Sequence, residues 1–276
     1  MPDCGRHARR LPRRRLHRRG ARPRAAHRQR PRHRRRRGPA SPGDHDLDIG
    51  LALALLDDER YTEISARLRA EGFAPDTNDA GNPTVQRWRL GELKVTVDFL
   101  MPPASEQAPT LRVQNLQPDF GALVTPGLEL AFAERVEVDL DGHTLKGERA
   151  RRTIPVCGPA AFVVLKALAF GDRGEPKDAY DLVYVIRHTP GRGRAIAERL
   201  ATHAEHHASI VQRALRLLAR DFDGPDGLGP TRAAGFVIAE PAAPGELDDA
   251  AADAQGYVDD VLRAARGLGL AVEEQA

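Results

Sequence analysis

The segment His45-Asp46-Leu47-Asp48-Ile49 and the apolar run after it, Gly50 to Leu55, are the most informative part of this chain. Side chains alternate between the two faces of a strand, so Asp46 and Asp48 are expected on the same face, about 7 Å apart. Two carboxylates at that spacing suit a hard cation such as Mg²⁺, which commonly acts on phosphates. Other Asp-x-Asp pairs occur in the chain, but they do not open an apolar strand that a helix and a further strand follow.

The residues after this strand predict a helix and then a hairpin. The helix is expected to begin at an N-cap, Asp57, and to stop at Gly72, with Ile64 and Leu68 on its apolar face.

The hairpin is predicted from two segments, 84–90 and 93–100, that alternate in polarity on either side of Gly91-Glu92. Its second strand carries a single acid, Asp98. Residues 101–120 contain four prolines and are expected to form a long loop.

A second antiparallel pair is predicted over residues 133–156, with strands at 135–140 and 151–156. Its turn is expected at Asp141-Gly142, where Asp139 and Asp141 would bond to the local backbone. From residue 157 the apolar period changes from two to 3.6, which predicts helices. Their expected ranges are 159–170, 176–187, 194–203, 206–221 and 246–268.

These patterns predict an α+β fold in three parts. Residues 1–43 are an arginine-rich segment, residues 44–156 an α/β core with a small mixed sheet and flanking helices, and residues 157–276 a helical C-terminal region. The chain shows no internal repeat.

Composition indicates a soluble protein. The chain has 276 residues, 41% of them apolar, and no apolar run long enough to cross a membrane. Cys4 and Cys157 are too few for a disulfide framework or a cysteine-based zinc site, and no signal peptide is recognisable. We therefore expect a cytoplasmic protein with no membrane partner.

The positive net charge of the chain comes from its first forty residues. They hold 17 of the 42 basic residues and one of the 39 acids, which leaves 25 basic and 38 acidic residues, a net of −13, in the remainder. Residues 1–43 have too few large apolar side chains to fold, so disorder is expected. Two further interpretations remain open: an arginine arm that binds nucleic acid through phosphates, or an out-of-frame translation of GC-rich coding sequence.

Three acids on strands, Asp46, Asp48 and Asp98, could hold two metal ions for phosphoryl transfer. Lys166 is the one charge within an otherwise apolar helical segment. It either extends into solvent along its own stem or faces a cleft and holds a triphosphate. Asp178 and Asp181 lie one turn apart at the start of the next helix, where acids favour the helix dipole.

Four short segments carry a family resemblance: Asp46-Leu47-Asp48-Ile49, Val95-Thr96-Val97-Asp98, Leu165-Lys166-Ala167-Leu168 and Lys177-Asp178-Ala179-Tyr180-Asp181-Leu182. Together they resemble the nucleotidyltransferase family of the DNA polymerase beta superfold, and in particular its AbiEii-type toxin branch. The resemblance spans about residues 44–188.

This resemblance implies transfer of a nucleoside monophosphate from an NTP with Mg²⁺. Asp46, Asp48 and Asp98 would be metal ligands, and Lys166 a phosphate or catalytic lysine with Asp178 as its acidic partner and Asp181 beside the nucleotide. The implied acceptor is an RNA such as a tRNA, a protein or a small molecule, and the implied partner is an antitoxin.

One feature of the family pattern is missing from the sequence. Members normally carry a Gly-Ser or Gly-Gly turn shortly before the Asp pair, where backbone N–H groups bind the triphosphate. Neither dipeptide occurs in residues 1–43. A catalytically degenerate protein that binds nucleotide is therefore the alternative to an active transferase, and a nucleic-acid-binding protein working through the arginine arm is a third hypothesis.

A possible zinc site was also considered at His203, His206 and His207. Their spacing can place two imidazoles on one helix face, but no cysteine lies near and the surrounding residues are polar. A solvated helix face is the favoured interpretation.

Overall fold

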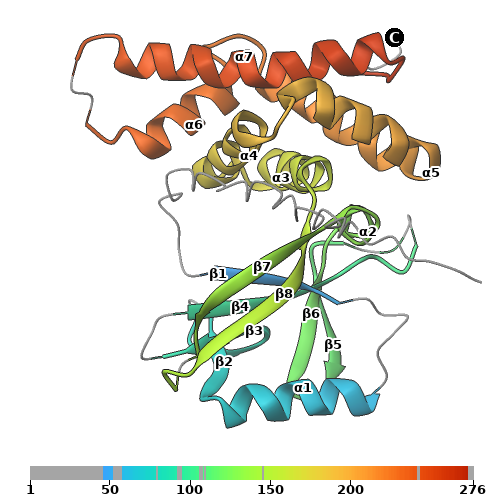
Figure 1. Ribbon diagram of the computed structural model, residues 1–276, viewed down its shortest axis with the longest axis vertical. Coiled ribbons are helices and arrows are strands. Elements are labelled where there is room, and N and C mark those ends of the chain that lie inside the picture. The colour runs from blue at the N-terminus through green and yellow to red at the C-terminus, as the bar shows by residue number, and fades with distance from the viewer. Residues whose placement is uncertain are drawn as a thin grey trace, which may run out of the picture. The chain divides into compact units, whose positions relative to one another are not determined.

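In the computed structural model, the aspartate pair lies on strand β1 (Asp46–Gly50), which pairs in parallel with β4 (Val95–Met101) (Figure 1). The sheet has the order β2-β3-β4-β6-β5, with β1 also paired to β4. The other strands are β2 (Phe73–Thr77), β3 (Pro83–Leu90), β5 (Val113–Gln117) and β6 (Phe120–Val124). Parallel and antiparallel pairs are mixed, as the sequence predicts.

The structure describes residues 46–51, 58–78, 80–91, 95–105, 108, 110–144, 146–240 and 243–272. All of them belong to one compact unit, residues 38–276. The predictions for residues 1–43, for the end of the first strand at 52–55 and for the N-cap Asp57 lie outside the described residues.

The predicted helix and hairpin are confirmed. Helix α1 (Asp58–Ala70) is followed by Gly72, whose φ of 86° is one that glycine adopts at low cost. Strands β3 and β4 pair antiparallel as predicted, but Leu90 is opposite Val95, so the register differs by two residues from the one that a turn at Gly91-Glu92 would give.

Aromatic side chains fill the space between α1 and the sheet. Trp88 and Phe120 are fully buried, and the ring of Phe120 lies 4.7 Å from that of Phe99 and 6.0 Å from that of Tyr61. Burial of such rings supplies much of the free energy that holds a small sheet to its helix. The alternate positions of β4, including Asp98, are directed to the other face of the sheet.

The long loop predicted at 101–120 is wrong in part. Val113–Gln117 forms strand β5, which turns at Pro118 and pairs antiparallel with β6. A short helix, α2 (Leu128–Ala133), was also missed. Its Phe132 lies so close to β1 that a Cβ at Gly50 would sit 3.2 Å from the Phe132 ring, so glycine lets α2 pack against the strand that carries the aspartate pair.

The second antiparallel pair is present but longer than predicted. Strands β7 (Arg135–His143) and β8 (Arg149–Cys157) pair over their full length, so the predicted turn at Asp141-Gly142 is wrong. Asp139 and Asp141 lie within β7 and bind Arg151 and Arg149 of β8 instead of the local backbone. Cross-strand ion pairs extend these strands where the sequence shows two turn-forming residues.

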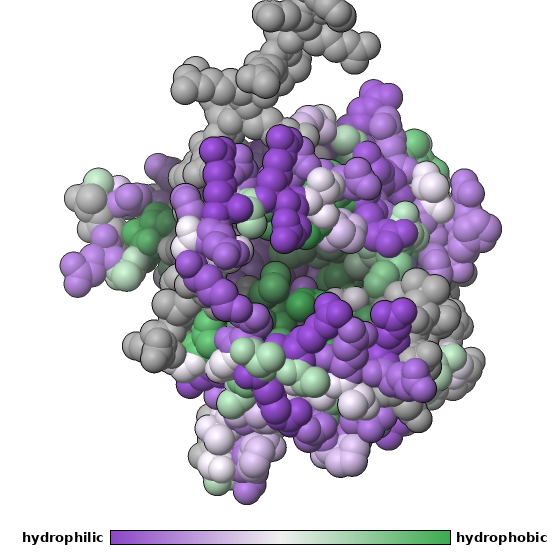
Figure 2. Space-filling model, turned by 60° about the horizontal axis from the view of Figure 1, so that its bottom comes forward, coloured by the Kyte–Doolittle hydropathy of each residue, from purple (hydrophilic) through white to green (hydrophobic). Residues whose placement is uncertain are grey.

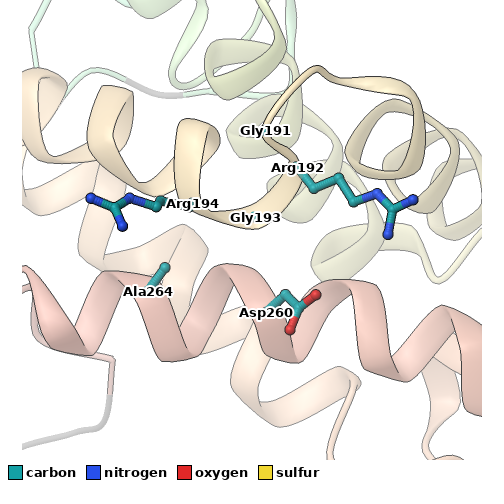
Figure 3. A pocket seen from close by; sticks show the side chains of 6 residues that line it. All are labelled: Gly191, Arg192, Gly193, Arg194, Asp260 and Ala264. Carbon is teal, nitrogen blue, oxygen red and sulfur yellow. The ribbon is translucent and has the colours of Figure 1, made fainter.

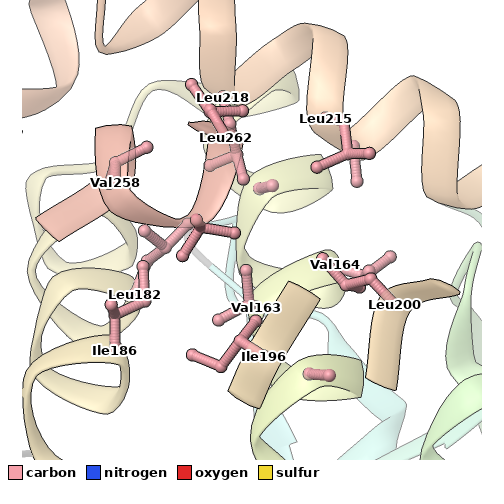
Figure 4. Close-up of a cluster of buried hydrophobic side chains, with 14 of the residues drawn as sticks. Val163, Val164, Leu182, Ile186, Ile196, Leu200, Leu215, Leu218, Val258 and Leu262 are labelled. Atoms are coloured by element: carbon pink, nitrogen blue, oxygen red, sulfur yellow. The ribbon is translucent and has the colours of Figure 1, made fainter. Parts of the chain in front are cut away.

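Helices begin directly after β8, as predicted. They are α3 (Pro159–Arg173), α4 (Pro176–His188), α5 (Arg192–Asp221), α6 (Leu228–Val237) and α7 (Glu246–Gly267). The two helices predicted at 194–203 and 206–221 are one helix that kinks at His207, and α6 was missed. Their inner faces share a core of buried aliphatic side chains, including Leu182, Leu215 and Val258 (Figure 4).

Glu134, which directly precedes β7, links this strand to the start of α3 through hydrogen bonds. Its Oε2 accepts a hydrogen bond from the backbone N–H of Ala161 at 2.9 Å and lies 3.1 Å from Nε2 of His203 on α5. A Cβ at position 158 would lie 2.3 Å from Cγ of Glu134, so Gly158 leaves the room that this buried carboxylate needs. The contact holds α3 in a defined direction relative to the strands.

Figure 2 shows that polar side chains cover most of one face of the molecule and that a hollow with apolar residues on its floor opens in this face. Within the described part of the chain, no helix combines the length and apolar character needed to cross a bilayer.

Candidate active site

Asp48 and Asp98 occupy neighbouring positions on paired strands. In the parallel register of β1 and β4, Asp48 is opposite Asp98 and Asp46 is opposite Thr96. Paired strands lie about 4.8 Å apart, and residues in register project from the same face of the sheet. The backbone therefore brings together the acids predicted from the sequence, although the side chain of Asp46 lies outside what the structure describes.

Arg87 of β3 holds the carboxylate of Asp98. Its Nε donates to Oδ1 at 2.8 Å and its Nη2 to Oδ2 at 2.6 Å. The two residues are opposite each other in the β3–β4 register. The sequence interpretation missed Arg87, and the predicted two-residue turn at Gly91-Glu92 would have placed it opposite Thr96; the observed register brings it opposite Asp98 instead.

Lys166 lies between two carboxylates. From the middle of α3, its Nζ is 3.0 Å from Oδ1 of Asp178 and 2.9 Å from Oδ2 of Asp181, both on α4. Only 17% of the Lys166 side chain is exposed, and 1% of the Asp178 side chain. The lysine is thus bound to two acids and does not extend into solvent along its stem.

The start of α4 explains why both acids point at α3. Pro176 occupies the first turn, where its missing N–H costs nothing, and Asp178 lies in the same turn, where acids favour the helix dipole. Asp181 follows one turn later on the same face and also binds Lys177, with 2.9 Å between Nζ and Oδ2.

The charges in this cluster shift one another's pKa values. Burial alone would raise the pKa of Asp178, but hydrogen bonds and charges from Arg173 and Lys166 lower it below its ordinary value. Burial alone would lower the pKa of Lys166, but the two aspartates raise it above its ordinary value. Both groups therefore stay ionised at neutral pH.

Arg173 binds Asp178 from the last turn of α3. Its Nε and Nη2 donate to the two oxygens of Asp178 at 2.6 and 2.9 Å. The hydrogen bonds to Asp178 raise the pKa of Arg173, burial opposes the rise, and the charges of Glu175 and Asp48 add to it. Arg173 therefore lies near enough to Asp48 for the two charges to interact. No sequence pattern used above identified this residue, which lies just before the break between α3 and α4.

The carboxylate oxygens at the sheet are suitable ligands for a hard cation, but the described side chains do not form a complete ligand set. Asp48 is exposed, Asp98 is adjacent, and Asp46 lies two residues along the same strand; carboxylate oxygens are the ligands that Mg²⁺ prefers. Among the described side chains, no three His, Cys, Asp or Glu residues come together in a metal-binding arrangement. For the predicted site, a complete ligand set thus needs the side chain of Asp46. The solvated helix face expected at the three histidines is wrong for His203, which is buried and bound to Glu134, whereas His206 is exposed.

The helical region also contains a cavity of about 410 Å³ between the start of α5 and α7 (Figure 3). Its lining includes two arginines that flank Gly193 and one acid on α7; the full lining is Gly191, Arg192, Gly193, Arg194, Asp260 and Ala264. None of the predicted site residues lines it.

The sequence model of one protein family matches residues 46–256 of this chain. Its description is nucleotidyl transferase AbiEii toxin, type IV TA system. The match includes every site residue predicted from the sequence. Neither the curated proteins nor the solved structures gave a match to the chain.

Proposed function

Because the chain belongs to the AbiEii nucleotidyltransferase toxin family of type IV toxin–antitoxin systems, we propose that it transfers a nucleoside monophosphate from an NTP to an acceptor. The acceptor is an RNA such as a tRNA, a protein or a small molecule. The family also implies an antitoxin as the functional partner. The site of transfer is the space between the acid face of β1 and β4 and the α3–α4 pair.

The single observation that carries this proposal is the register of β1 and β4, which puts Asp48 beside Asp98. With Asp46 two residues away on β1, these acids would bind Mg²⁺. Bound there, Mg²⁺ would offset phosphate charge and lower the pKa of the attacking hydroxyl. The three aspartates would fix the position of the nucleotide relative to the acceptor, because they are carried on paired strands with little freedom to move.

The helical cluster would face the phosphates of the nucleotide. Lys166 bonds to both Asp178 and Asp181, and Asp178 is buried. In this proposal these residues orient cationic groups toward the triphosphate, and they do so before the substrate arrives. Such preorganised charge lowers the barrier more than charge that must be rearranged during the reaction.

The test is a transfer assay with each of the four α-³²P-labelled NTPs, Mg²⁺, and total RNA or total protein as acceptor. Asp48→Asn and Asp98→Asn should each lower the rate about 100-fold or more, as expected when a group that stabilises transition-state charge is removed. Asp141→Asn is the matched control, because Asp141 is a strand aspartate bound to an arginine on the β7–β8 pair. If the transfer rate fell equally in all three variants, the proposed site would be wrong.

One observation favours a second candidate, a catalytically degenerate protein that binds nucleotide. Both oxygens of Asp98 are engaged by Arg87, an arrangement typical of a structural ion pair. This candidate predicts no labelled product from any NTP, together with an upward shift of Tm when an NTP is added. A labelled product that depends on Asp48 would exclude it.

A further inference from the structure

The two cations that bind Asp178 from α3 differ in their exposure. Lys166 is 17% exposed, whereas the side chain of Arg173 is 57% exposed. Lys166 bonds to Asp178 and Asp181, which offset its charge on two sides. Arg173 shares its one bonded acid with Lys166, so its own charge is only partly offset.

The geometry of the guanidinium leaves one nitrogen available. Nε and Nη2 bind the two oxygens of Asp178, so one edge of the planar group is used. Its third nitrogen, Nη1, makes no hydrogen bond to any residue that the structure describes. The charge of Asp48 on β1 also acts on Arg173.

The bonded groups of this cluster carry one more positive than negative charge. Lys166, Arg173 and Lys177 supply three positive charges against the two negative charges of Asp178 and Asp181, and the charges of Glu175 and Asp48 also act on Arg173. Arg173 is the most exposed of the three cations. An arginine whose edge is fixed by a buried carboxylate loses little freedom when it binds a phosphate oxygen.

We propose that Arg173 is the residue that contacts the triphosphate of the bound nucleotide, and that Lys166 acts as a positioning residue by holding Asp178 in place behind it. This inference rests on the proposed function. It gives Arg173 a substrate-binding role that the sequence resemblance did not assign. Lys166 acts indirectly, because it holds the aspartate that binds Arg173.

Binding measurements on the full chain test this role without relying on turnover. The probes are inorganic tripolyphosphate, ATP and AMP, each with MgCl₂, and affinity is measured by calorimetry. Arg173→Gln should weaken tripolyphosphate and ATP about 10- to 100-fold, the range for a hydrogen bond between charged groups, and AMP by less than about threefold. Arg173→Lys should recover part of the loss.

Arg220→Gln is a closely matched control. Arg220 also ends a helix, binds a buried aspartate, Asp221, through Nε and Nη2 at 2.7 and 2.9 Å, and has a 60% exposed side chain. It lies on α5, which carries none of the site residues. Similar Tm changes in Arg173→Gln and Arg220→Gln, with loss of tripolyphosphate binding in the first alone, are the expected result.

The outcomes separate this inference from the proposed function. If the wild-type chain binds and transfers nucleotide but Arg173→Gln keeps its affinity for tripolyphosphate, the role of Arg173 is wrong and the proposed function stands. If the wild-type chain neither binds the probes nor forms a labelled product, the proposed function itself fails. Equal weakening of ATP and AMP would also overturn the inference, because it would indicate a general distortion of the site.

Discussion

The fold places two groups of acids in very different surroundings. On the sheet, Asp48 is exposed and Asp98 is 15% exposed, with Arg87 as the cation bonded to Asp98. On the helices, Asp178 is 1% exposed and Asp181 is 14% exposed, and three cations surround them. The helical acids are bonded to three cations within the helices, whereas Asp98 is bonded to one arginine and Asp48 is exposed.

This difference indicates which group is a scaffold and which is a binding surface. A buried ion pair costs much solvation free energy, and the protein recovers that cost only when every partner is present. Asp48 and Asp98 are like charges at opposite positions on paired strands, and a bound cation would relieve their repulsion. We therefore expect the helical acids to govern stability and the sheet acids to govern ligand binding.

Removal of Lys166 is the strongest test of that contrast. Lys166→Met should lower the free energy of unfolding by about 3 kcal/mol, because the buried Asp178 loses one of its two cations and methionine supplies no charge. Urea unfolding followed by circular dichroism measures the change. Lys177→Met, which breaks an i,i+4 pair to Asp181 at a 35% exposed lysine, should cost less than about 1 kcal/mol. If both variants lowered the free energy of unfolding by less than about 1 kcal/mol, the buried cluster would not be important for stability.

The pH dependence of stability gives a second, smaller effect. The pKa of Asp178 is lower in the folded chain than in the unfolded chain, so the folded state binds fewer protons near that pKa. Its stabilising contribution is full above the unfolded value of about 3.9 and is lost as the pH falls through the folded value. Asp178→Asn should remove this component, whose slope is at most about 1.4 kcal/mol per pH unit.

Urea midpoints measured from pH 6 down to pH 2 would show this difference. The wild-type curve should fall below about pH 4 more steeply than that of Asp178→Asn. Asp141→Asn serves as the control, since its side chain is 50% exposed. Parallel curves for the wild type and Asp178→Asn would mean that the ion pairs of Asp178 also persist in the unfolded chain.

Part of this contrast could be predicted from the sequence. Period-two alternation fixes the faces of the two hairpin strands, so Asp98 could be placed on the acid face, but a turn at Gly91-Glu92 gives a register two residues away from the observed one. The i,i+3 spacing puts Asp178 and Asp181 on one helix face. The pairing of β1 with β4 follows from neither pattern, because parallel strands are joined by long crossovers that local spacing does not describe.

The role of Arg173 depends on tertiary structure. It is five residues from Asp178, across a break at Gly174, where φ is 65°. Whether its side chain reaches Asp178 depends on the angle between α3 and α4, which the packing of the whole helical core sets. Strand β5 was missed for a related reason, since its pairing with β6 outweighs the prolines around it.

The smallest expected effect is on the stability of Asp48→Asn. Because Asp48 is exposed and its charge interacts with that of Arg173, its neutralisation should change the free energy of unfolding by less than about 1 kcal/mol. Urea unfolding of this variant beside Asp141→Asn measures the effect. A loss above about 1 kcal/mol would mean that Asp48 is held in a structural ion pair. A small change in stability, combined with lost transfer, would mean that the chain keeps Asp48 for the reaction and not for folding.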